Sequence, residues 1–146
     1  MPKTLSSILV ALDGSELSKK ALRFAEKIAA TDETIELHLV TVKSTDINPF
    51  FPEAPIYYTD AQIKEIDEEI YKMLDEAEAD LTVKNPVKKH IEVGRPGPTL
   101  VDFANKHHID LIVMGSRGLS SLKALFLGSV SHYVVQLAEC PVLIIK

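Results

Sequence analysis

The chain has 146 residues, of which 46% are hydrophobic and 25% charged, a composition typical of one globular domain with a substantial core. Its formal net charge of −5 argues against a general nucleic-acid-binding surface, and no apolar run approaches the roughly 20 residues that span a bilayer. The N-terminus lacks a signal-peptide pattern, and the single cysteine, Cys140, cannot form an internal disulfide. We therefore expect one cytosolic domain over residues 1–146, without a nucleic-acid or membrane partner.

The first half of the chain alternates strand and helix patterns. Apolar runs predict buried strands over residues 6–12 and 35–42. Ser15 is a suitable N-cap for the helix between them, whose apolar face comprises Leu17, Ala21, Phe24, Ala25 and Ile28. Three prolines between residues 48 and 55 exclude regular structure there. We interpret this segment as a packed surface loop, with a lid or a partner surface as alternatives.

The second half continues the alternation. Thr59 and Gln62 form a capping box before a helix whose apolar stripe comprises Ile63, Ile66, Ile70, Leu74, Ala77 and Leu81. Strands are predicted over residues 87–93, 109–114 and 141–145, and helices over residues 97–107, with Pro98 near the first position, and 130–138. The alternation predicts a three-layer α/β sandwich with a mostly parallel sheet.

The most informative segment contains Gly115, Gly118 and Gly128, and it follows the strand over residues 109–114. Glycines let the backbone approach an anion closely, and the N–H groups at a helix start point towards it. Ser129 is expected to cap the following helix. Because neither a Walker A motif nor a dinucleotide fingerprint is present, the segment predicts a phosphate site of another class.

A second loop with site chemistry follows the first strand at Asp13-Gly14-Ser15. Ligands of parallel sheets bind outside the carboxyl ends of the strands, so the two loops would form one site if their strands are neighbours. Asp13 suits a ribose or base donor, or it caps the first helical turn. Arg117 suits a phosphate, or it is an exposed loop arginine; Ser131 reaches the same anion or lies within the helix.

Other reactive side chains have simpler interpretations. His107 and His108 close a helix, where cations are favourable, and they do not suggest a metal site. Cys140 is expected to be a small buried residue, since no activating base is evident near it. No catalytic triad or metal-binding spacing is recognisable, so no catalytic or metal-ligating residue is predicted.

The spacing G-x2-G-x9-G-[ST] from Gly115 to Ser129 resembles the nucleotide-binding signature of the universal stress protein family, in its ATP-binding branch. Blocks at residues 10–15, 93–96, 110–115, 127–130 and 140–145 also resemble those of the family, in the same order. The resemblance covers the whole chain and implies a Rossmann-like, adenine nucleotide alpha hydrolase-like fold with strand order 3-2-1-4-5.

The resemblance also implies roles for individual residues. Asp13 and the backbone near Ala11 and Val42 would hold adenine and ribose, while Met114 and Gly115 would line the nucleoside pocket. The phosphates would be held by Gly118, Gly128, Ser129 and Val130, with Arg117 and Ser131 as weaker matches. ATP is the implied ligand, with Mg²⁺ or Mn²⁺ as a possible companion and no protein ligand for the metal evident.

The sequence therefore predicts an ATP-binding, nucleotide-responsive stress regulator or binding module. A slow ATPase or phosphotransferase on the same fold is the alternative, but the chain lacks an evident base for efficient hydrolysis. A phosphoaccepting receiver domain is rejected, because only Asp13 follows the first strand and the chain ends at Lys146. The apolar edge strand Val142–Ile145 and the resemblance both favour a homodimer through that strand; a further protein partner is left open.

Overall fold

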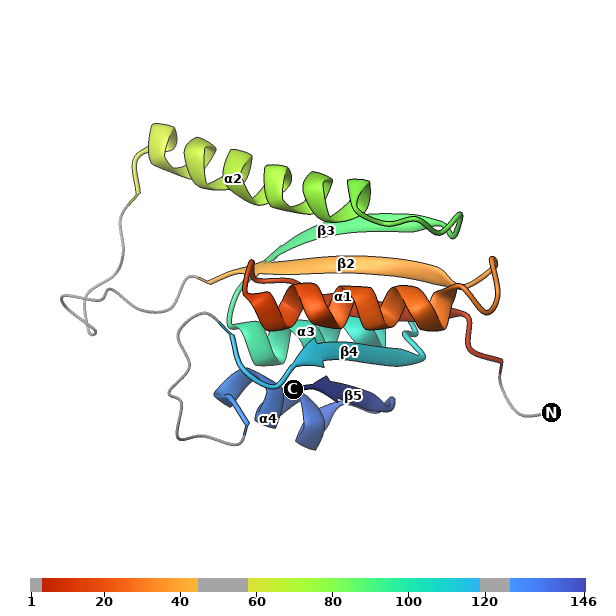
Figure 1. Cartoon of the computed structure of the whole chain (residues 1–146). Helices are drawn as coiled ribbons and strands as arrows, with labels where there is room; N and C mark the ends of the chain where they lie inside the picture. Colours follow the sequence, from red (N-terminus) through yellow and green to blue (C-terminus); the bar gives the residue numbers. More distant parts are fainter. Residues whose placement is uncertain (1–3, 45–57, 119–126) are drawn as a thin grey trace.

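The computed structural model describes residues 4–44, 58–118 and 127–146, and the proline loop over residues 49–55 lies outside them. The described chain alternates five strands with four helices (Figure 1). In chain order they are β1 (Ser7–Ala11), α1 (Glu16–Ala29), β2 (Glu36–Lys43), α2 (Asp60–Ala79), β3 (Val87–Val93), α3 (Pro96–Lys106), β4 (Leu111–Gly115), α4 (Ser129–Leu137) and β5 (Val142–Ile145). The predicted order of elements is confirmed.

The strands form one parallel sheet in the order β3-β2-β1-β4-β5, as the family resemblance implied. β1 lies at the centre, and Ile8, Leu9 and Val10 pair with Leu111, Ile112 and Val113 of β4. At the amino end of this pair, Asp110 Oδ2 accepts hydrogen bonds from the Ser6 N–H, the Ser6 hydroxyl and the Ser7 N–H, at 2.9, 2.7 and 3.1 Å. One carboxylate thus joins two strands that are distant in sequence.

Helices cover both faces of the sheet, which confirms the three-layer architecture (Figure 1). On one face, α1 and α2 pack over a core that includes Ile8, Val10, Leu37, Leu39 and Leu74. On the other, α3 and α4 pack over a core that includes Leu9, Val40, Phe103, Ile112 and Val134. Alternate residues of the same strands supply the two cores, as the period of a strand requires.

The helix starts confirm two predicted caps and correct a third. The Ser15 side chain accepts from the Ser18 N–H, and Thr59 and Gln62 form both bonds of the capping box. Ser129, however, is the first residue of α4, and Gly128 occupies the N-cap without a side-chain bond. α3 begins at Pro96, one residue earlier than predicted, because a proline suits the first helical position, where its missing N–H is not needed.

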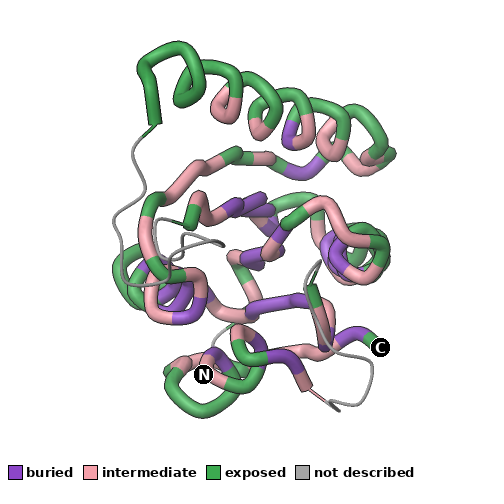
Figure 2. The backbone as a smooth tube through the Cα atoms, turned by 90° about the vertical axis from the view of Figure 1, so that its left-hand side faces the viewer, coloured by how far each residue is buried: buried purple, intermediate pink, exposed green. Residues whose placement is uncertain are grey.

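The burial of side chains in α1 and α2 differs in part from the prediction. On the predicted face of α1, Ala21 and Ala25 are buried, but Phe24 is 44% exposed, and Leu22, which was not predicted on that face, is buried. In α2 the predicted stripe is mostly half-buried and only Leu74 is fully covered (Figure 2). None of the described helices combines the length and apolar character that crossing a bilayer requires.

Candidate functional site

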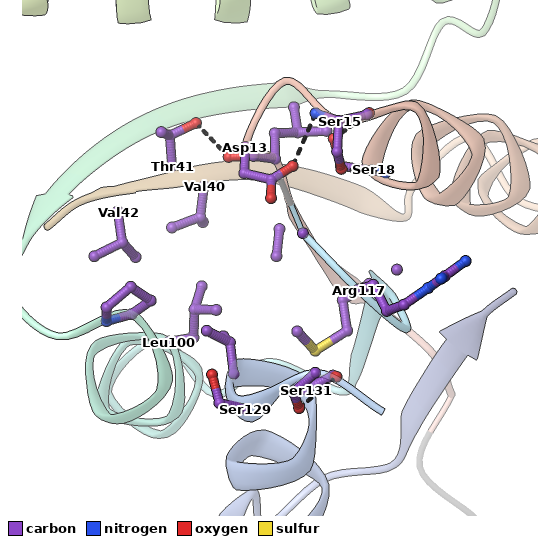
Figure 3. Close-up of a pocket in the computed structure, with 18 of the residues that line it drawn as sticks. Asp13, Ser15, Ser18, Val40, Thr41, Val42, Leu100, Arg117, Ser129 and Ser131 are labelled. Atoms are coloured by element: carbon purple, nitrogen blue, oxygen red, sulfur yellow. Dashed lines mark hydrogen bonds between the residues drawn. The ribbon is translucent and has the colours of Figure 1, made fainter. Parts of the chain in front are cut away.

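A cavity of about 600 Å³ opens at the carboxyl ends of β1, β2 and β4 (Figure 3). Its volume lies within the range of small-molecule sites, which is roughly 300–1,000 Å³. The eleven residues predicted from the sequence all line it, namely Ala11, Asp13, Val42, Met114, Gly115, Arg117, Gly118, Gly128, Ser129, Val130 and Ser131. The structure therefore brings together in one cavity residues that lie as far apart in the chain as Ala11 and Ser131.

The β1 loop forms one wall. Gly14 has φ +84°, a conformation that L side chains rarely adopt, and this turn lets α1 start directly behind β1. Asp13 Oδ1 accepts from the Ser15 N–H at 2.9 Å, while the carboxylate as a whole faces the cavity (Figure 3). The Thr41 hydroxyl donates to the Leu12 carbonyl at 2.9 Å, which fixes the loop to β2. Asp13 thus takes part in the turn before α1 and also lines the cavity.

The glycine segment forms the facing wall, and its two ends are bonded to each other. The Gly128 N–H and the Ser131 hydroxyl both donate to the Ser116 carbonyl, at 2.7 and 2.8 Å. The Ser116 N–H in turn donates to Ile145 O of β5 at 2.8 Å. These bonds hold the start of α4 beside the end of β4, although residues 119–126 between them are outside the described chain.

Close packing explains two of the glycines. A Cβ at Gly118 would lie 2.5 Å from Asp13 Oδ2, so the β1 loop and the glycine segment meet at this point. A Cβ at Gly115 would lie 2.8 Å from the Leu17 Cβ, a fixed atom of α1. The packing of α1 on β4 therefore requires a glycine at position 115, a reason that the sequence pattern did not reveal.

The start of α4 supplies polar groups without a side-chain cap. The N–H groups of the first turn, at Ser129, Val130 and Ser131, have no intrahelical acceptor, and the helix dipole adds partial positive charge there. The Ser131 hydroxyl donates to the Ser116 and Gly128 carbonyls, so its proton is used within the protein. The Arg117 side chain extends away from the centre of the cavity (Figure 3). The start of α4 therefore presents backbone N–H groups among the residues that line the cavity.

The other end of the cavity is apolar. Val40, Val42 and Leu100 lie there, away from Arg117 (Figure 3), and Ala11 and Met114 are further predicted apolar residues of the lining. Sequence reasoning did not assign the remaining lining residues, which are Leu12, Ser15, Ser18, Val40, Thr41, Ile70, Met73, Pro96 and Leu100. Val40 and Thr41 could have been found from their place at the carboxyl end of β2. Ile70 and Met73 come from α2, whose position over the site no local pattern indicates.

Comparison with known proteins agrees with this geometry. The profile of the universal stress protein family matches residues 4–146. The chain is similar to the universal stress protein YxiE of Bacillus subtilis, with 37% identity over 97% of this chain and 99% of the relative. Among solved structures it is similar to UspA from Lactobacillus plantarum, with 27% identity, 99% of both chains covered and a TM-score of 0.75. A universal stress protein solved in complex with cAMP has 27% identity, 97% coverage of both chains and a TM-score of 0.71. These matches extend over nearly the whole chain, and the protein therefore belongs to the universal stress protein family.

Proposed function

We propose that the protein binds an adenine nucleotide, with ATP preferred, and acts as a cytosolic, nucleotide-responsive regulator of the stress response. The observation that carries the proposal is the meeting of the β1 loop, the glycine segment and the α4 N-terminus around one cavity. The complex of a relative with cAMP supports an adenine nucleotide as the class of ligand.

The two ends of the cavity suit the two ends of a nucleotide. The apolar side chains of Val40, Val42 and Leu100 offer a slot for a flat base, and the Asp13 carboxylate accepts from ribose hydroxyls. The first-turn N–H groups of α4 and the backbone at Gly118 suit the phosphates. The described residues contain no group of three or more His, Cys, Asp or Glu side chains arranged to hold a metal ion. Mg²⁺ or Mn²⁺ would therefore enter with the triphosphate.

Binding is favoured over efficient hydrolysis. Efficient phosphoryl transfer needs a positioned base or water and cationic groups at the transferred phosphate. Asp13 already accepts from the Ser15 N–H at the nucleoside end, and Arg117 extends away from the centre of the cavity. Slow turnover stays the alternative, and it would be recognised by phosphate release that is lost in both Asp13→Ala and Arg117→Ala variants.

Thermal unfolding with ATP, ADP, AMP and cAMP tests the ligand class. A ligand at 100 times its dissociation constant stabilises the folded state by about 2.7 kcal/mol, which raises the midpoint of a chain of this length by several degrees. An unchanged midpoint with all four nucleotides at millimolar concentration would contradict the proposal.

A charge variant at the α4 N-terminus tests the phosphate end. Ser129→Asp adds a negative charge where the helix dipole favours it, so the apoprotein should be as stable as before or more so. The same charge repels phosphate, and ATP affinity should fall by about tenfold or more, since 1.4 kcal/mol of repulsion is one decade. Ser129→Asn is the neutral control of the same shape, and adenosine should bind all three proteins alike. Equal ATP affinity for the Asp and Asn variants would place the phosphates elsewhere.

We also propose a homodimer in which β5 pairs with its counterpart in a second copy. The strand Val142–Ile145 lies at an edge of the sheet, and Val135 and Leu137 of the neighbouring α4 are exposed. An unpaired apolar edge favours pairing with another strand. Sedimentation equilibrium should give twice the 16.1 kDa of one chain at micromolar concentration. The mass of a single chain would exclude the dimer.

A further inference from the structure

Three histidines from separate elements gather on the α3 side of the sheet, at a distance from the cavity residues of β1. His38 lies on β2, His90 on β3, and His107 at the C-cap of α3; we call these three the histidine cluster. The rings of His38 and His90 lie nearly parallel, at 15°, with centroids 5.2 Å apart, and the His107 centroid lies 6.1 and 5.7 Å from theirs. Phe103 of α3 contacts all three rings. The cluster therefore joins the edge strand, its neighbour and a helix.

The hydrogen bonds of His38 determine its protonation. His38 Nε2 lies 2.6 Å from Glu36 Oε1, so this nitrogen carries a hydrogen that it donates to the carboxylate. His38 Nδ1 lies 3.0 Å from His90 Nε2, and one of these two nitrogens must donate to the other. When both rings are neutral, His90 Nε2–H donates to the bare His38 Nδ1. The bonds then run in one direction, from His90 through His38 to Glu36.

The geometry accepts one additional proton but not two. If His38 is the imidazolium, its Nδ1–H donates to His90 Nε2, and His90 moves its own hydrogen to Nδ1. If both rings are charged, two N–H groups face each other across 3.0 Å, and the hydrogen bond is lost. Two cations would then lie side by side, with the His107 ring 5.7 Å from that of His90.

The surroundings do not offset a second charge. From β2, Glu36 is the single carboxylate against the pair, and it also forms an ion pair with Lys88 at 3.3 Å. From β3, Lys88 repels a charged His90, and from α3 His107 does the same. Burial lowers the pKa of His38 below its ordinary value of 6.5, although Glu36 opposes the shift. Burial also lowers the pKa of His90, and the charges of His38 and His107 add to this effect.

We propose that the histidine cluster is a proton-operated joint, which holds β3 and α3 to β2 at neutral pH and loosens the β3 edge of the sheet in mild acid. β3 lies at the edge and pairs with β2 over Val87–Val93, with His38 opposite Lys88 and Val40 opposite His90. Separation of the two imidazoles therefore acts directly on the ladder that holds this strand. The inference is independent of the nucleotide, because no member of the cluster lines the cavity.

The direction of the pH effect follows from the proton balance. Both histidines have a lower pKa in the folded protein than in the unfolded chain. As the pH falls below about 6.5, the unfolded chain binds protons that the folded protein does not, and the folded state loses stability. The loss continues until the pH passes the lowered values. Opening of β3 exposes the same two imidazoles, so it shares this dependence.

Imidazole NMR titration and amide hydrogen exchange test the proposal. Below about pH 6.5, His38 and His90 should titrate as a coupled pair. After correction for intrinsic exchange rates, β3 protection should fall between about pH 7.5 and pH 5, by up to roughly tenfold for each pKa unit of lowering, while β1 protection changes less. In His90→Gln, which keeps a hydrogen-bonding group but cannot titrate, β3 protection should depend less on pH than in the wild type, because only His38 of the pair still binds a proton, whereas His132→Gln should behave as the wild type.

Two results would overturn the proposal. One is constant β3 protection in the wild type across this range, and the other is the same acid loss in His90→Gln. Should His90→Gln not fold, His107→Gln serves in its place, because His107 is exposed and its replacement removes only the third charge. The acid loss of β3 protection should then be smaller than in the wild type, because the charge of His107 no longer lowers the pKa of His38 and His90, and an unchanged loss would count against the proposal.

Discussion

The two helices on one face of the sheet, α1 and α2, are held by different forces. α1 has 14 residues and buries five of them, Ser18, Ala21, Leu22, Ala25 and Ala29. α2 has 20 residues and buries only Leu74. Ion pairs connect α2 to the sheet instead, from Lys43 to Asp67 and from Lys89 to Asp75 and Glu78. The longer helix is thus the less firmly packed one.

The contrast matters for the site because both helices contribute to it. α1 packs so closely on β4 that Gly115 has no room for a side chain. α2 brings Ile70 and Met73 to the cavity from its more exposed layer. One wall of the site is therefore part of the core, and another belongs to a helix that surface charges help to hold. Local opening with low free energy is expected in α2 first.

The largest effect is expected from Leu22→Ala in α1. This side chain is 5% exposed, and its truncation should lower the free energy of unfolding by about 2–5 kcal/mol through lost burial and a cavity. Ile63→Ala in α2 is the matched comparison. Because Ile63 is 39% exposed, its truncation should lower the free energy of unfolding by only about 0.5 kcal/mol. Urea unfolding measures both, and similar values would remove the distinction between the helices.

The next largest effect on stability is expected from substitution of Asn85, which lies just before β3. Its Nδ2 donates to the carbonyls of Ala29, Asp32 and Ile35 at 2.9, 2.8 and 2.9 Å, so it joins the end of α1 to the strands. Asn85→Ala removes the side-chain donor from all three carbonyls, although those of Ala29 and Asp32 keep backbone donors, and it should destabilise by roughly 1–3 kcal/mol. Asn85→Asp should be worse at neutral pH, since a carboxylate would face the carbonyls. Recovery of the Asp variant on mild acidification, measured by urea unfolding, would support this cause.

Removal of either helix cap, at Ser15 or at Thr59, should have a smaller effect, of about the same size for both. Ser15 and Thr59 each accept from the N–H three residues later, and Ala at either position should lower helix stability by about 1 kcal/mol. In Thr59→Ala the loss should appear as faster hydrogen exchange in the first turns of α2 alone. In Ser15→Ala it should appear in global unfolding, because α1 opens with the core. Exchange confined to α1 in Ser15→Ala would contradict this.

The smallest effect concerns the pair of Lys43 and Asp67, at 2.6 Å between β2 and α2. Both side chains are partly exposed, so Lys43→Met should change stability by about 1 kcal/mol or less. Salt is the more sensitive probe, because screening weakens such pairs. Raising the salt concentration should lower α2 protection in the wild type and less so in the variant. If the hydrogen-exchange protection of α2 does not change with salt concentration, apolar contacts and not ion pairs hold the helix.

Much of the fold could be predicted because its signals are local. Alternating apolar runs, the Ser15 cap and the Thr59–Gln62 box each act within a few residues, and the structure confirms them. The prediction of Ser129 as the N-cap of α4 is wrong. A serine at a helix start suits an N-cap, but Gly128 occupies that position and its N–H donates to the Ser116 carbonyl. The strand order came from the family resemblance, since no residue pattern specifies which parallel strands are neighbours.

The site could be predicted where its residues follow strands β1 and β4, because parallel strands end at one edge of the sheet. Ile70 and Met73 could not be predicted as site residues, since α2 reaches the cavity from a distant part of the chain. The histidine cluster was missed for the same reason. His107 was interpreted as a helix-closing cation, and only the pairing of β2 with β3 beneath α3 brings it near His38 and His90.

The central place of β1 has a consequence during synthesis. The half-sheet β3-β2-β1 is available once residue 93 has been made, but the second edge of β1 must wait for β4, which ends at Gly115. Translation proceeds at roughly 5–20 residues per second, so the nascent chain carries an open, apolar edge for roughly 1–4 seconds. Its side chains are Ile8, Leu9 and Val10, which are fully buried in the finished protein. The pairing of β1 with β4 is therefore the step most open to misassembly. It occurs late in translation, although β1 is the first strand to be synthesised.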